Sequence, residues 1–160
     1  MAKGQRVLEA GTLLRPSEIG VLASLGRARV KVVRRPVVAI LPTGDELVEP
    51  GRDLPPGKIY SINGYSIAAS VLRYGGIPKE LGIGRDNLEA LTSKIQEGLD
   101  SDLLLTTAGV SLGDYDMVKD VLASLGEIAF WTVRMRPGKP LAFGLLHKRD
   151  SRGNVVKKVP

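Results

Sequence analysis

The sequence predicts an α/β protein with three layers, in which a mostly parallel sheet lies between helices. Short apolar runs at Val37–Leu41 and Leu103–Thr107 are typical of strands buried on both faces of a parallel sheet. Apolar residues recur at helical spacing in Ile67–Leu72, Leu88–Leu99 and Val118–Leu125. Strands that alternate with helices at this spacing form right-handed βαβ units, and such units build a parallel sheet covered on both faces.

The composition is that of a globular protein with a basic balance. The 160 residues are 43% hydrophobic and include no Cys, so disulfides and thiolate metal sites are excluded, which suits the cytoplasm where we expect the protein. No apolar run approaches the roughly 20 residues of a membrane span, so we expect no membrane partner. The net charge of +6 favours anionic ligands, but aromatic residues are only 4%, too few for base stacking, so we expect no nucleic acid.

We expect two parts, an appendage at residues 1–26 and a main domain at residues 27–160. In the first part, Pro16 opens a short helical pattern that ends at Gly26. Pro36 then interrupts an alternating stretch just before the first buried strand. The first part is either an appendage or the tail of a preceding domain.

The order of the remaining elements follows from turn residues. An irregular crossover at Val48–Lys58 contains three Pro and two Gly. Gly75 and Gly76 end the helix that follows, and Gly126 ends the last helix. Further strands and a polar hairpin are expected at Lys79–Ile83, Ile128–Met135, Leu141–Leu146 and His147–Pro160.

Polar loops directly follow three of the predicted strands, at Thr43–Glu46, Arg85–Asp86 and Thr107–Asp116. In an open α/β sheet, ligands bind at the carboxyl ends of the strands. We therefore expect a set of carboxylates to converge on one edge of the sheet: Asp45, Glu46, Asp86, Asp114 and Asp116. Arg136 and Lys139 follow another strand and are expected to bring cations to the same edge.

The loop after the Leu103–Thr107 strand consists largely of small residues: Ala108, Gly109, Ser111 and Gly113. Small residues let main-chain N–H groups approach an anion closely. Asp114 and Asp116 end this loop, so a hard cation such as Mg²⁺ is expected between the carboxylates and a bound phosphate.

Several of these residues have structural alternatives that the sequence leaves open. Asp86 with Glu89 resembles the capping box of a helix start, and Asp116 is a candidate N-cap for the helix that begins near Met117. Asp45 and Glu46 would otherwise form a solvated loop. The stretch from 136 to 140 would otherwise be a plain turn with exposed cations.

A nucleophile-elbow match at Gly109–Gly113 is rejected. The G-x-S-x-G elbow needs a helix that begins at the serine, whereas Gly113–Asp116 intervenes here. The only histidine, His147, stands beside Lys148 and is expected at the surface. The sequence therefore argues against a serine hydrolase.

Five motifs together resemble one family, the molybdopterin-binding domain of molybdopterin molybdenumtransferases of the bacterial MoeA and gephyrin E-domain type, which has a MogA-like fold. The motifs are Thr43–Gly51, Lys58–Asn63, Leu81–Asp86, Thr107–Asp116 and Arg136–Pro140. The resemblance places residues 1–26 at the end of the family's preceding domain. It also implies that residues 27–160 lack the C-terminal part of the domain, since a substrate loop is expected after Pro160.

The resemblance implies a role in molybdenum cofactor biosynthesis, in which molybdenum from molybdate is inserted into adenylylated molybdopterin, AMP is released and Mg²⁺ assists. Implied catalytic residues are Glu46, Asp86, Asp116 and Lys139, of which the three carboxylates are also implied metal ligands. Implied binding residues are Thr43, Gly44, Asp45, Asn63, Thr107, Gly109, Ser111, Gly113, Arg136 and Gly138. Two alternatives stay open, a molybdopterin-binding module without turnover and a molybdopterin adenylyltransferase of the same fold.

Three positions depart from the pattern of this family. Ala108 stands where the family has glycine, Arg136 where lysine is common, and Ser61 where an acid is frequent. The charge at position 136 is kept, but its geometry is not. A sheet without its final strand exposes an edge, so we also expect weak self-association into a homo-oligomer.

Overall fold

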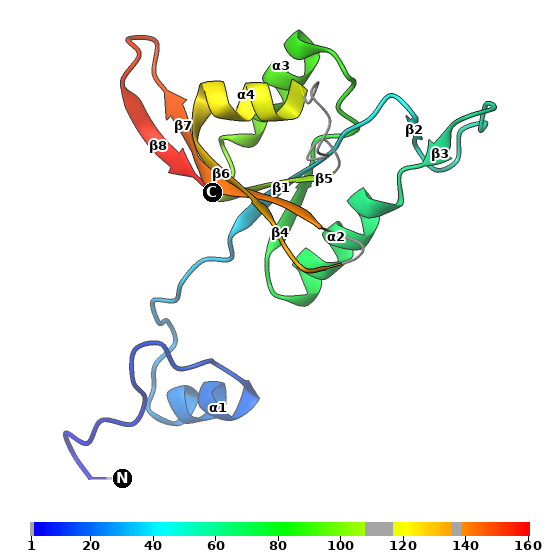
Figure 1. The fold of residues 1–160 in the computed structure, drawn as a ribbon. Helices are drawn as coiled ribbons and strands as arrows, with labels where there is room; N and C mark the ends of the chain where they lie inside the picture. Colours follow the sequence, from blue (N-terminus) through cyan, green and yellow to red (C-terminus); the bar gives the residue numbers. More distant parts are fainter. Residues whose placement is uncertain (1, 108–116, 136–138) are drawn as a thin grey trace. The chain divides into compact units, whose positions relative to one another are not determined.

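The computed structural model describes residues 2–107, 117–135 and 139–160. The chain divides into two compact units, Met1–Arg34 and Arg35–Pro160 (Figure 1). The first unit contains one helix, α1 (Pro16–Ser24), with Pro16 in its first turn. The Arg15 main-chain N–H donates to Glu18 at 2.9 Å, and this bond lowers the pKa of the Glu18 carboxyl. None of residues 2–34 is buried, so this unit has no apolar core of its own.

The second unit is organised around a parallel sheet of order β4–β1–β5. β1 (Val37–Pro42) pairs with β4 (Ile77–Glu80) on one side and with β5 (Leu103–Thr107) on the other. The predicted strands at 37–41 and 103–107 are confirmed. The prediction of a strand at 79–83 was wrong in its bounds, because pairing with Val37 begins at Ile77. An edge strand tolerates the proline at position 78.

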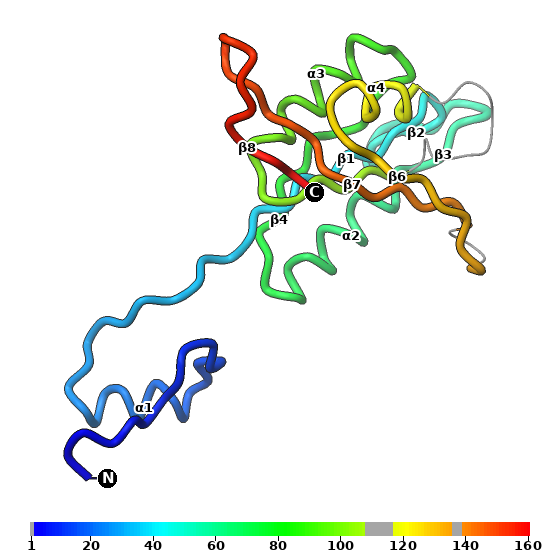
Figure 2. Tube along the Cα trace, turned by 60° about the vertical axis from the view of Figure 1, so that its left-hand side comes forward, coloured from blue at the N-terminus to red at the C-terminus, as the bar shows by residue number. Residues whose placement is uncertain are grey.

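Alternate residues of β1 face opposite helical layers, which confirms the three-layer fold. Ala39 and Leu41 pack with α3 (Leu88–Gly98) and α4 (Met117–Leu125) on one face. Val38 and Ile40 pack with α2 (Ile62–Arg73) on the other. Figures 1 and 2 show α2 across the sheet from α3 and α4. A strand covered on both sides must be apolar at every position, which explains the unbroken run in the sequence.

The start of α2 and the N-cap of α3 differ from expectation. α2 begins at Ile62, five residues before the apolar repeat. α3 is capped by Asn87, whose side-chain oxygen accepts from the N–H groups of Glu89 and Ala90 at 3.0 and 3.1 Å. The capping-box interpretation of Asp86 was therefore wrong, and its carboxylate is available for other contacts. The start of α4 at Met117 is as predicted, and the question of Asp116 as its cap lies outside the described residues.

The C-terminal strands form an antiparallel sheet of order β6–β7–β8. β6 (Gly126–Thr132) and β7 (Pro140–Arg149) start earlier than predicted, and β7 also ends later. Gly126 pairs with Leu146 as the first residue of β6, where a side chain would collide with the main chain of Leu145. The prediction that the last helix ends at Gly126 is confirmed, and Gly126 is in addition the first residue of β6.

The polar hairpin predicted for residues 147–160 is confirmed by β8 (Val155–Val159), which pairs with β7. In its turn, the Asp150 carboxylate accepts from the N–H groups of Arg152 and Asn154, both at 2.9 Å, and these bonds, led by that of Asn154, lower the pKa of Asp150. His147 lies within β7 with a buried Nε2 atom, so the prediction that it is a surface residue was wrong.

The crossover between β1 and α2 forms a small arm (Figure 1). In it, β2 (Leu47–Val48) pairs in parallel with β3 (Ile59–Tyr60), and the segment between them is irregular, as predicted. Of the helices in the described ranges, none combines the length and apolar character that a membrane crossing requires.

Candidate functional site

The carboxyl ends of the three parallel strands are joined by main-chain hydrogen bonds. Thr43 is 1% exposed, and its N–H and hydroxyl both donate to the carbonyl of Thr107, at 3.0 and 3.2 Å. The N–H of Gly44 donates to the carbonyl of Gly84 at 3.0 Å. The structure therefore brings Thr43, Gly44 and Thr107 together at one edge, where the loops after β1, β4 and β5 begin.

Asp45 and Asp86 bridge two of these loops reciprocally. The N–H of Asp45 donates to Oδ2 of Asp86 at 3.3 Å, and the N–H of Asp86 donates to Oδ1 of Asp45 at 3.2 Å. Both residues are exposed, and each carboxylate keeps its second oxygen outside this pair of bonds. The two acids are therefore held at this edge, and their exposed carboxylates are chemically suited to a cation or a hydrogen-bond donor.

Glu46 follows directly and is placed by the shape of the loop. Gly44 has a φ of +140°, a conformation that side chains rarely adopt. A Cβ atom at Gly44 would lie 2.6 Å from Cδ of Glu46, so the Glu46 carboxylate occupies the space that the glycine leaves free. Glycine at position 44 is thus required by its backbone conformation, and its lack of a side chain leaves room for the Glu46 carboxylate.

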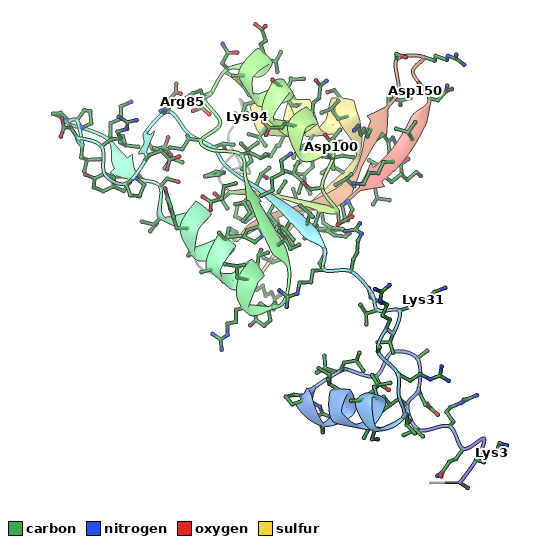
Figure 3. All side chains as sticks on the ribbon, turned by 180° about the vertical axis from the view of Figure 1, so that it is seen from behind. Lys3, Lys31, Arg85, Lys94, Asp100 and Asp150 are labelled. Carbon is green, nitrogen blue, oxygen red and sulfur yellow. The ribbon has the colours of Figure 1, made fainter. Side chains whose placement is uncertain are left out.

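Two cations hold the main chain of this loop, and the sequence analysis missed both. Nη1 of Arg85 donates to the carbonyls of Asp45 and Leu47, each at 3.1 Å. Nζ of Lys58 donates to the Asp45 carbonyl at 3.0 Å. Arg85, labelled in Figure 3, comes from the loop after β4, whereas Lys58 comes from the arm. Arg85 stands next to Asp86 and Lys58 next to Ile59, each inside one of the five motifs, and this was the signal that the sequence offered.

Asn63 lies in the first turn of α2, which packs against the end of β1. A Cβ atom at Gly64 would lie 3.2 Å from Cγ of Pro42, so the helix approaches the strand closely at this point. Asn63 is exposed, and its carbonyl accepts from the Ser66 hydroxyl at 3.1 Å. The first turn of α2 is thus held beside the residue that precedes Thr43.

The remaining site predictions are placed differently or not at all. Lys139 is exposed and stands before β7 in the antiparallel sheet, where its carbonyl accepts from the Val133 N–H at 2.8 Å. The predicted residues outside the described ranges are Gly109, Ser111, Gly113, Asp114, Asp116, Arg136 and Gly138. Within the described residues, no group of three His, Cys, Asp or Glu side chains is arranged to hold a metal ion. The predicted triad includes Asp116, so it stays a prediction.

The fold and this edge define a class of protein, the α/β proteins that present polar loops at the carboxyl ends of a buried parallel sheet. Residues 39–158 match the family described as probable molybdopterin binding domain. The chain belongs to this family, and the resemblance found in its sequence motifs is confirmed.

Curated relatives and solved structures agree with this assignment. The chain is 46% identical over 140 residues to a molybdopterin molybdenumtransferase of Nostoc sp., covering 86% of this chain and 32% of the relative. It is 42% identical over 146 residues to one of Haemophilus influenzae, covering 90% and 36%. The crystal structure of a molybdopterin biosynthesis MoeA protein from Pyrococcus horikoshii matches with a TM-score of 0.75 and 31% identity, over 95% of this chain and 36% of that one. The chain thus spans about a third of the length of these relatives.

Proposed function

We propose that this chain binds adenylylated molybdopterin and takes part in molybdenum cofactor biosynthesis as a molybdopterin molybdenumtransferase. In this reaction molybdenum from molybdate enters the molybdopterin, the adenylate is cleaved and AMP leaves. The proposal is supported by family membership and by relatives that carry this name at up to 46% identity. It assigns the binding function to residues 27–160, which include the whole of the matched region.

One observation carries the proposal, the joining of the β1 and β4 loops through Asp45 and Asp86. These bonds hold exposed carboxylates at the edge where α/β sheets bind their ligands. The ends of β1 and β5 are joined in the same place through Thr43. A site that is organised before the ligand arrives loses less conformational entropy on binding.

Mg²⁺ is part of this proposal. Glu46 and Asp86 supply exposed carboxylate oxygens, the hard ligands that Mg²⁺ prefers, and the carboxylate of Asp116 would have to complete the set. Mg²⁺ bound there would offset phosphate charge. In this proposal Asp86, Glu46 and Asp116 hold the ion, and the Asp45–Asp86 bonds fix the direction of the Asp86 side chain.

The remaining residues, several of which lie outside the described ranges, keep the roles implied by the family. Gly109, Ser111 and Gly113 would contact the pterin phosphate or the adenylate through N–H and hydroxyl groups. Lys139, with Arg136, would balance the charge of phosphate or molybdate. Thr43, Gly44, Asn63, Thr107 and Gly138 complete the proposed binding surface.

Titration of the 160-residue chain with molybdopterin, with and without Mg²⁺, tests the binding part. We expect saturable binding that Mg²⁺ strengthens, and no binding under either condition would contradict the proposal. The reaction is tested with adenylylated molybdopterin and molybdate. Release of AMP supports the transferase, consumption of ATP with molybdopterin supports an adenylyltransferase, and binding with neither identifies a binding module.

Self-association and a cytoplasmic location are the last parts of this proposal. The cysteine-free composition supports a reducing compartment. Self-association is supported by an apolar face on β6 and β7 that carries Trp131, Leu141 and Phe143, which are 49%, 47% and 59% exposed. Trp131 and Phe143 stack with ring centroids 6.5 Å apart. Exposed apolar faces of this kind are typical of contact surfaces.

A further inference from the structure

We propose that Arg85 is a positioning residue, which fixes the loop at residues 43–47 so that its carboxylates face the ligand. The inference rests on the proposed function for the identity of the ligand, and it adds a residue to which that proposal gives no role. Arg85 lies one residue before Asp86, yet the bonds of its Nη1 atom go to main-chain carbonyls of another loop.

The first argument is the geometry of the guanidinium. Nη1 of Arg85 donates to the carbonyls of Asp45 and Leu47, both at 3.1 Å. The Asp45 carbonyl belongs to the peptide group before Glu46 and the Leu47 carbonyl to the peptide group after Leu47, so one side chain holds the main chain on either side of the Glu46–Leu47 pair. Glu46 is exposed, so the main chain rather than burial fixes where its side chain starts, and the carboxylate lies over Gly44.

The second argument is that other donors also bind the main-chain carbonyls of this loop. The Asp45 carbonyl also accepts from Nζ of Lys58 at 3.0 Å, and the Glu46 carbonyl accepts from the Ile59 N–H at 2.9 Å. The carbonyls of residues 45 to 47 are thus all occupied by donors from Arg85 or from the arm. With its carbonyls turned toward these donors, the loop offers its exposed carboxylates to a ligand.

The third argument is electrostatic. The loop carries Asp45 and Glu46, and Asp86 is held against it, so three negative charges lie close together before any ligand binds. Arg85 and Lys58 place two positive charges within hydrogen-bonding distance of the same loop. Charge-assisted hydrogen bonds are stronger than neutral ones, and the nearby cations reduce repulsion among the carboxylates.

The test compares the 160-residue chain with Arg85→Gln, Arg85→Lys and Arg52→Gln. The last variant is a matched control, since it removes an equally positive and exposed side chain from the arm. Amide hydrogen exchange reports the loop directly. In Arg85→Gln we expect exchange at Asp45 and Leu47 to rise about tenfold, the effect of losing one charge-assisted contact, with exchange of the β1 core unchanged.

Binding of molybdopterin is the second readout. We expect the affinity of Arg85→Gln to fall about tenfold and that of Arg85→Lys to recover in part, because an ammonium group can donate to a carbonyl but lacks the planar fork. Arg52→Gln should match the unmodified chain in both readouts. Unchanged loop exchange in Arg85→Gln would overturn the positioning role, as would faster exchange with unchanged affinity. If the unmodified chain bound no molybdopterin, the proposed function would fail, and the exchange data would still decide whether Arg85 holds the loop.

Discussion

The Glu46 carboxylate lies over the α-carbon of Gly44, in space that any other residue at position 44 would fill with its Cβ atom. Gly44 also has a φ of +140°, so the turn itself depends on glycine through its backbone. This relationship couples the shape of the loop to the placement of a carboxylate that the proposed function assigns to Mg²⁺. It also provides the first test.

Gly44→Ala is expected to destabilise the fold and to displace Glu46. Strain at a positive φ costs about 1–3 kcal/mol, and the Glu46 carboxylate must move away from the new methyl group. Gly51→Ala is the matched control, because Gly51 has a φ of +86° with nothing within 4 Å of its Cβ position. Urea denaturation should show the larger loss in Gly44→Ala. Equal losses in the two variants would mean that the Glu46 contact contributes nothing.

Asp86→Asn is expected to weaken ligand binding while leaving the stability of the fold nearly unchanged. The asparagine oxygen still accepts from the Asp45 N–H, so the free energy of unfolding should change by less than about 1 kcal/mol. The charge that attracts Mg²⁺ is lost, so Mg²⁺-dependent binding of molybdopterin should weaken at least about tenfold. This is the effect expected when one carboxylate contact to the ion is removed. Isothermal titration calorimetry measures this, with Asp53→Asn on the exposed arm as the control. Equal binding by both variants would remove Asp86 from the site.

Acid should weaken a contact between the end of α3 and β7. The hydrogen bond and the charge of Lys148 hold the pKa of Asp100 below its ordinary value of 3.8. A lowered pKa means that the pair stabilises the fold above this value, and that the stabilisation is lost as the pH falls through the folded-state pKa.

We therefore expect Asp100→Asn to lower the melting temperature near neutral pH, by a small amount because the pair is at the surface. The difference from the unmodified chain should close as the pH falls below 3.8. Lys148→Gln should show the same pH dependence, because it removes the same pair. A difference that persists at low pH would assign the effect to packing rather than to charge.

Phe143→Lys is expected to reduce self-association. Phe143 and Trp131 share one face of the β6–β7 ladder with Leu141, and a lysine there would place charges opposite one another in any contact between two copies. Light scattering after gel filtration measures the mass at several concentrations. Val156→Lys on β8, where Val156 is 58% exposed, is the control. A concentration-independent monomer without any substitution would contradict the self-association proposal.

The layers and the strands β1 and β5 were predictable because each is a short apolar run in the sequence. β1 is buried on both faces and β5 is partly buried, and both strands are where the pattern placed them. β4 has no buried residue, so its pattern is weaker and its bounds were misplaced. The start of β6 was missed because Gly126 was interpreted by its helix-ending preference, whereas close pairing with β7 decided its place.

The site was predictable to the level of loops but not of individual contacts. That Asp45 and Asp86 meet follows from the rule for strand ends. That they exchange hydrogen bonds, and that Asn87 rather than Asp86 caps α3, depends on local dihedral angles that no spacing encodes. Arg85 was missed because a cation next to Asp86 suggests an ion pair, whereas here both Arg85 and Lys58 bind main-chain carbonyls.

The reciprocal bonds between residues 45 and 86 join segments that are 41 positions apart in the chain. Replacing either residue by one whose side chain has no acceptor would remove the bond to the N–H of the other, so selection acts on the two together. Among sequences that share this loop geometry, substitutions at the two positions should therefore be inherited as pairs, even where the ligand has changed.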